Sequence, residues 1–67
     1  SETGNAATRT IHVYGATTST VTIAGQSVNV SNGHAQLTVS VNTAAKRNDY
    51  SITVGGKTVQ VHCFPGK

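Results

Sequence analysis

Apolar and polar residues alternate along most of this 67-residue chain. The pattern is clearest between His34 and His62, in the runs HAQLTVSV, YSITV and KTVQVH. Because successive side chains of a strand point to opposite faces of a sheet, this alternation predicts half-buried antiparallel strands. Similar alternation upstream, from Arg9 onward, predicts three further strands and no helix. The apolar positions expected to face inward are Ile11, Val13, Val21, Ile23, Val28, Val30, Ala35, Leu37, Val39, Val41, Tyr50, Ile52, Val54, Val59 and Val61.

Glycine-containing pairs predict how the central strands are connected. Asn32-Gly33 is a strong signal for a two-residue type I′ turn, which would set Val30 opposite Ala35. Upstream, a type II′ turn at Gly25-Gln26 would bring two more inward residues face to face. Together these turns predict a meander of the second, third and fourth strands.

The last two strands are predicted to form a separate hairpin around Gly55-Gly56. This turn would set Ile52 opposite Val59 on the inner face. The outer pairs would be Thr53 with Thr58, Ser51 with Gln60, and Asp49 with His62. We therefore expect a cross-strand contact between Asp49 and His62.

Two connections do not fit tight turns and instead predict a second sheet. A two-residue loop at Gly15-Ala16 would set inward Ile11 opposite outward Thr20, and residues 42–49 are too many for a hairpin loop. The expected fold is a small six-stranded antiparallel β-sandwich with three strands in each sheet, and the alternative is a small β-barrel. Residues 1–8 are expected to be a flexible arm, 9–64 a single β domain and 65–67 a tail.

The segment from Ala35 to Val61 resembles the C-terminal half of immunoglobulin-like domains. The run LTVSV is followed by a loop, NDYSITV, a turn and KTVQV, with Tyr50 in the place of the corner tyrosine. The chain departs from that family because it has no tryptophan and only one cysteine, Cys63. Its composition, rich in Thr, Ser, Val and Asn and poor in charge, also resembles small β-domains that decorate bacteriophage capsids and tails.

The charge and the cysteine content make some functions and cellular compartments less favoured than others. The net charge is +3, and Lys46-Arg47 is the only adjacent pair of cations. Nucleic-acid binding usually needs a denser basic cluster with aromatic residues, so it is disfavoured. No apolar run has the length of a membrane span, and a single thiol fits a reducing compartment. Ser1 fits a complete, non-secreted protein that has lost its initiator Met, but a mature secreted fragment would begin in the same way.

Candidate chemistry is sparse. The only carboxylate side chains belong to Glu2 in the arm and Asp49 in the crossing loop, so paired acid–base catalysis is not expected. Cys63 shares the inward parity and is interpreted as a buried apolar residue. No two histidines have local metal-ligand spacing. We therefore predict no catalytic residues, no cofactor and no metal.

The favoured function is that of a non-enzymatic structural protein in an assembly, namely a viral capsid or tail decoration protein, in the virion or cytoplasm. A core built mainly from valine predicts self-association or docking on a larger assembly. The alternatives are an extracellular, glycan-binding Ig-like module and a small basic single-stranded nucleic-acid binder. The predicted interface residues are Tyr14, Cys63, Phe64 and Pro65; the candidate basic contacts are Arg9, Lys46 and Arg47; the structural turn residues are Gly25, Asn32, Gly33, Gly55 and Gly56; and the core corner residue is Tyr50.

Overall fold

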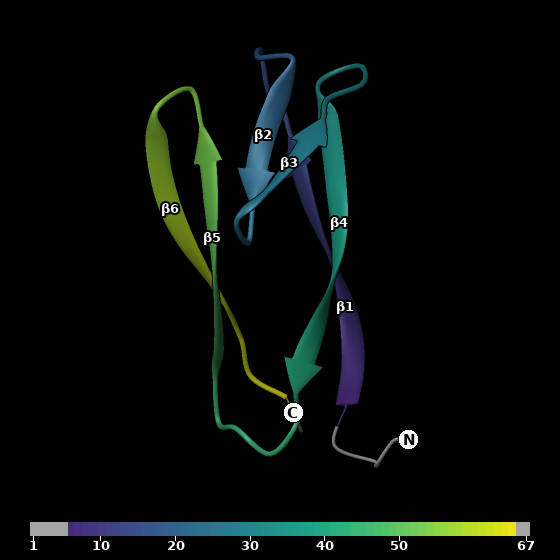
Figure 1. The fold of residues 1–67 in the computed structure, drawn as a ribbon, viewed down its shortest axis with the longest axis vertical. Helices are drawn as coiled ribbons and strands as arrows, with labels where there is room; N and C mark the ends of the chain where they lie inside the picture. Colours follow the sequence, from purple (N-terminus) through teal and green to yellow (C-terminus); the bar gives the residue numbers. More distant parts are fainter. Residues whose placement is uncertain (1–5, 66–67) are drawn as a thin grey trace.

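The computed structural model describes residues 6–65, which form an all-β fold of six strands in two antiparallel sheets (Figure 1). This confirms the predicted fold class. The strands are β1 (Ala6–Tyr14), β2 (Thr20–Ile23), β3 (Gln26–Asn29), β4 (His34–Asn42), β5 (Asn48–Val54) and β6 (Lys57–Cys63). Strand β1 begins at Ala6 rather than at Arg9, so part of the predicted arm belongs to the sheet. The rest of the arm, residues 1–5, and residues 66–67 of the predicted tail lie outside the described residues.

The strands are divided between the sheets in a way that the sequence did not predict. One sheet contains only β1 and β4, and the other has the order β3-β2-β5-β6. The predicted division into three and three is therefore wrong, and so is the meander of β2, β3 and β4. The Asn32-Gly33 turn forms, with Ser31 and His34 exchanging two backbone hydrogen bonds of 2.9 Å, but only this isolated bridge follows it. Strand β4 pairs instead with β1 along its whole length, which satisfies far more backbone groups than the four-residue β3 could.

The turn between β2 and β3 is also shifted from its predicted position. Its central residues are Ala24 and Gly25, with φ angles of 51° and 80°, and not Gly25-Gln26. This sets Val21 opposite Val28. The Ala24 amide donates to the Ser51 carbonyl at 2.8 Å, and the Ala24 side chain packs against the core. These contacts offset the cost of a left-handed conformation at alanine.

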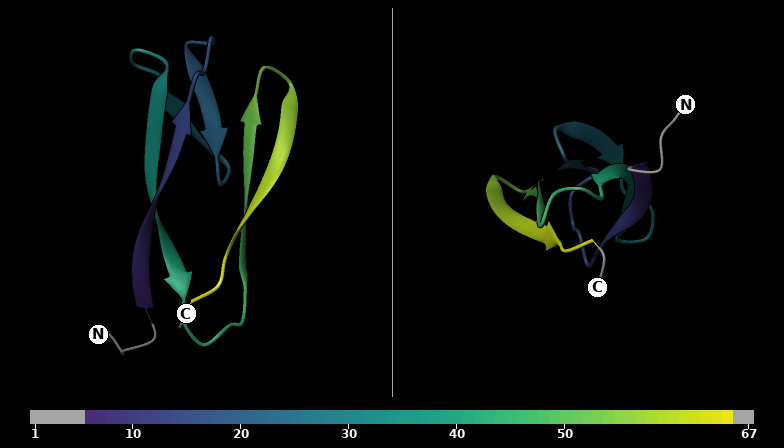
Figure 2. Two further views of the ribbon diagram at one scale, coloured as in Figure 1. Left: turned by 180° about the vertical axis from the view of Figure 1, so that it is seen from behind. Right: turned by 90° about the horizontal axis from the view of Figure 1, so that it is seen from below.

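The final hairpin has the predicted register. Strands β5 and β6 pair through Gly55-Gly56, with Ile52 opposite Val59 and Asp49 opposite His62. The hydroxyl groups of Thr53 and Thr58 lie 2.8 Å apart on the outer face. The two long connections also behave as expected, because residues 15–19 and residues 43–47 each carry the chain from one sheet to the other (Figures 1 and 2).

The core is small and lies where β2 faces β4. Its centre consists of Val21, Ile23, Ala35 and Ile52, and Val39 and Val41 are also buried. Most of the other predicted inward residues pack around this cluster, but Val59 is 58% exposed, so its assignment to the core is wrong. Strand β6 is the edge of its sheet, and the two-stranded sheet is too narrow to cover it at this point.

Candidate functional site

The two sheets leave one side of the molecule open, between β1 and β6. The β5–β6 hairpin and the β1–β4 pair lie on opposite sides of the molecule, and β2 and β3 fill the space between them at one end only (Figures 1 and 2). Each of β1 and β6 has a single partner strand among residues 6–65. A cavity of about 440 Å³ occupies the part that β2 and β3 do not fill. We call it the open-side groove; it is lined by Arg9, Ile11, His12, Val39, Tyr50, Ile52, Val61, His62, Cys63 and Phe64.

The walls of the open-side groove are mainly apolar. Ile52 and Val39 are buried, and Ile11 and Val61 are half-buried. Alternation explains these four apolar residues, because the groove continues the inner faces of both sheets beyond the packed core. Its volume lies within the range of about 300–1,000 Å³ that is typical of ligand sites.

Tyr50 joins the two sheets at the groove. Its ring is half-buried in the lining, and its hydroxyl donates a 2.6 Å hydrogen bond to the backbone carbonyl of Ser40. Because Ser40 belongs to β4 and Tyr50 to β5, this bond ties one sheet to the other.

The C-terminal end of β6 forms one rim of the groove. Cys63 is half-buried, whereas Phe64 is 56% exposed and tilts against the ring of His62 at a centroid distance of 6.5 Å. Pro65 follows and is half-buried. Tyr14, the fourth predicted interface residue, is 74% exposed and does not line the groove. The structure therefore places Cys63 and Phe64 at one site and Tyr14 at another.

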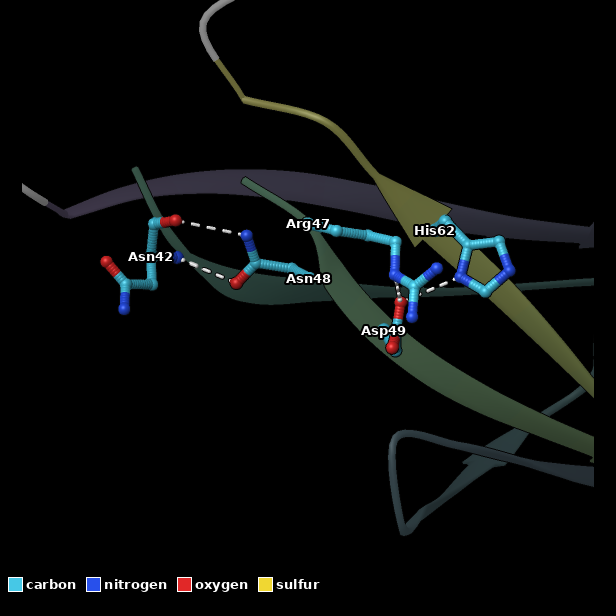
Figure 3. A network of polar contacts seen from close by, with 5 residues as sticks. All are labelled: Asn42, Arg47, Asn48, Asp49 and His62. Carbon is cyan, nitrogen blue, oxygen red and sulfur yellow. Dashed lines mark hydrogen bonds and ion pairs between the residues drawn. The ribbon is translucent and has the colours of Figure 1, made fainter. Parts of the chain in front are cut away.

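Asp49 is the centre of a polar network beside this rim (Figure 3). One carboxylate oxygen accepts from Nδ1 of His62 at 2.7 Å and lies 2.9 Å from Nε of Arg47. The predicted contact between Asp49 and His62 is thus confirmed. The hydrogen bond from His62 holds the pKa of Asp49 below its ordinary value; desolvation opposes this effect, and the charge of Arg47 supports it.

The three candidate basic residues have different surroundings. Arg47 is paired with Asp49, and Arg9 lines the groove while donating to the Thr8 carbonyl at 2.8 Å. Lys46 is exposed in the loop between β4 and β5. Asn42 and Asn48 flank that loop, and the Asn48 side chain exchanges two 3.0 Å hydrogen bonds with the backbone of Asn42 (Figure 3). These bonds hold the two ends of the loop together.

A second cluster of side chains lies on the outer face of the β1–β4 sheet. Tyr14 is directly opposite His34, and His12 is on the same face. The Tyr14 and His34 rings are stacked at a centroid distance of 4.7 Å, and Nδ1 of His12 lies 3.1 Å from Nε2 of His34. The predicted strand pairing did not reveal this cluster, because it did not place β1 beside β4. The signal that could have found it is the shared parity of Ile11 with Leu37 and Val13 with Ala35.

Within residues 6–65, no three His, Cys, Asp or Glu side chains come together as a metal-binding group. No helix long and apolar enough to cross a membrane occurs in this part of the chain. No protein-family model matches the chain, and no curated protein or solved structure is significantly similar to it.

Proposed function

We propose that this chain is a non-enzymatic structural module that enters an assembly by burying its open-side groove against another copy of itself. A viral capsid or tail decoration protein is the kind of assembly component that fits this role. The observation that carries the proposal is the apolar, 440 Å³ groove between two strands that each lack a second partner.

The groove has the chemistry of a protein contact. A strand edge presents unpaired backbone donors and acceptors, which an incoming extended segment can satisfy by β-strand addition. The groove supplies an apolar surface beside two such edges, and Phe64 and Val59 add exposed apolar area on the β6 side. Asp49, the only carboxylate side chain among residues 6–65, is already engaged by His62 and Arg47. This supports a binding role rather than acid–base chemistry.

The size of the core favours a second copy as the partner. The buried apolar residues include none larger than isoleucine, and Cys63 is the only cysteine. Domains below about 70–80 residues rarely obtain more than about 3–5 kcal/mol from one core, and commonly add disulfides, metals or oligomerisation. A disulfide within one chain needs two cysteines, so association of copies is the direct way to bury more apolar surface. The net charge of +3 is low enough not to oppose it.

Light scattering over a range of protein concentrations tests the proposal. We expect the solution mass to rise above 6.9 kDa with concentration, and the melting temperature to rise with it. Phe64→Ser should shift association to higher concentration, because Phe64 lines the groove. Tyr14→Ser is the matched control, since Tyr14 is more exposed than Phe64 and lies outside the groove. A mass of one chain at all concentrations, or equal effects of both variants, would contradict the proposal.

A further inference from the structure

His12 and His34 form a pair of imidazoles held together by the longest strand pairing of the fold. His12 lies within β1, and His34 is the first residue of β4, directly after the Asn32-Gly33 turn. The backbone of His34 is fixed by its two 2.9 Å hydrogen bonds with Ser31. The two residues are diagonal neighbours, because His12 pairs with Gln36 and His34 with Tyr14. Diagonal neighbours on one face are within reach of long or aromatic side chains.

The facing ring nitrogens have a spacing that suits a shared metal ion. Nδ1 of His12 and Nε2 of His34 are 3.1 Å apart, and the two ring planes are within 11° of parallel. Two histidine nitrogens at about 2.0–2.1 Å from one ion are about 3.3 Å apart in tetrahedral geometry, and about 2.9 Å apart at a right angle. The observed separation lies between these values. Small side-chain rotations would aim both lone pairs at one point, since His12 is exposed and His34 only half-buried.

We infer that His12 and His34 chelate one divalent first-row transition ion of the kind that prefers imidazole, such as Zn²⁺ or Cu²⁺. The ion takes the place of the proton that the two nitrogens share in the metal-free pair. The ring that donates in the metal-free pair transfers that proton, through solvent, to its own far nitrogen, so both rings stay neutral and both facing nitrogens are free to bind the ion. Water completes the coordination on the solvent side. Tyr14, stacked on His34 at 4.7 Å, restricts rotation of that ring and so helps to hold the ligand in place.

The third described histidine is a poorer ligand. Nδ1 of His62 already donates to Asp49, and Arg47 lies against the same carboxylate oxygen. The fixed positive charge of Arg47 disfavours a cation there. No residue with a fixed charge is placed opposite or between His12 and His34, because their strand partners are Gln36 and Tyr14. The site thus lies on the outer face of the β1–β4 sheet, and it borders the open-side groove because His12 also lines that groove.

Metal binding at this pair has a consequence for stability. An ion that binds the folded chain and not the unfolded one shifts unfolding to higher temperature by mass action. Because the ligands come from β1 and β4, the ion cross-links the two strands of the smaller sheet. The melting temperature should therefore rise with ion concentration.

The test is calorimetric titration of the 67-residue chain with Zn²⁺, alongside four single variants. We expect saturable binding of one ion per chain, and a loss of affinity of about tenfold or more in His12→Gln and in His34→Gln, since loss of even an outer-shell partner costs that much. His62→Gln and Cys63→Ser should bind as the unmodified chain does. The inference is overturned if the unmodified chain shows no saturable binding, if either His12→Gln or His34→Gln retains full affinity, or if Cys63→Ser abolishes binding.

A second measurement does not depend on the folding of any variant. Substoichiometric Cu²⁺ broadens nuclear magnetic resonance signals close to the ion that it binds. In the unmodified chain, we expect the signals of His12, Tyr14 and His34 to broaden first. Broadening centred on His62, Cys63 or Phe64, with His34 and Tyr14 unaffected, would overturn the inference.

Discussion

Replacing Tyr50 with phenylalanine isolates the hydrogen bond that ties the two sheets together. The Tyr50 hydroxyl donates to the Ser40 carbonyl at 2.6 Å, and phenylalanine removes this bond while it leaves the ring in the groove lining. A hydrogen bond between neutral groups contributes a net of about 0.5–1.5 kcal/mol. Ser40 is an exposed residue, so water can partly replace the lost donor, and the lower half of that range applies. We expect the free energy of unfolding to fall by about 0.5–1 kcal/mol.

The assay is unfolding in urea, monitored by circular dichroism. It is carried out at one fixed protein concentration, because association would change the apparent stability. In a domain of this size, the loss corresponds to a melting temperature lower by about 2–8 °C. Tyr14→Phe is the control, because it removes a hydroxyl from a residue that is 74% exposed. Equal stability of Tyr50→Phe and the unmodified chain, or an equal loss in Tyr14→Phe, would refute the role of Tyr50 as a link between the sheets.

Three further changes test the turns and the polar network. Gly33→Val should lower the free energy of unfolding by about 1–2 kcal/mol, measured in urea, because φ is +76° and a β-branched residue is strained there; equal stability would contradict a type I′ turn. Ala24→Asn should raise the midpoint of thermal unfolding, since asparagine tolerates the φ of 51° better than alanine; a lower midpoint would contradict this. Because its pKa is lowered on folding, Asp49 stabilises the folded chain above its unfolded pKa, and this stability is lost as the pH falls through the folded pKa. The free energy of unfolding of Asp49→Asn should therefore depend less on pH in the acid range than that of the unmodified chain. The same pH dependence in both proteins would count against the network.

Strand positions and the final hairpin followed from the sequence because both depend on local signals. Alternation locates strands, and the Gly55-Gly56 turn fixes which residues of β5 and β6 lie opposite each other. The Asp49–His62 contact was predictable for the same reason. The exposure of Val59 could not be predicted in this way, because alternation assigns a side chain to one face of the sheet but does not show whether another layer covers that face.

The register between β2 and β3 shows the limit of that reasoning. A turn at Gly25-Gln26 and the observed turn at Ala24-Gly25 differ by a shift of two residues in pairing. A shift of two leaves every side chain on the same face, so the apolar pattern fits both. Only the contacts of Ala24 with β5 and the core decide between them, and these depend on the tertiary structure.

Local sequence signals do not determine which strand pairs with β4. Asn32-Gly33 favours pairing of β3 with β4, and the turn forms, but β4 gains a much longer partner in β1. That pairing joins residues far apart in the chain, and it creates both the outer cluster of His12, Tyr14 and His34 and the open side between β1 and β6. Local signals therefore predicted neither candidate site, although the matching parity of β1 and β4 is compatible with the pairing that creates both.

The central claim is that association of copies buries the open side of the molecule. Amide hydrogen exchange, measured at low and at high protein concentration, tests this claim most directly. If copies meet at the open-side groove, the amides of β1 and β6 should exchange more slowly at high concentration, because an incoming segment covers these two edges. The β2–β3 hairpin lies at the other end of the molecule and should exchange equally at both concentrations (Figure 1). Exchange in β1 and β6 that does not change with concentration, or new protection on β3 instead, would contradict the account.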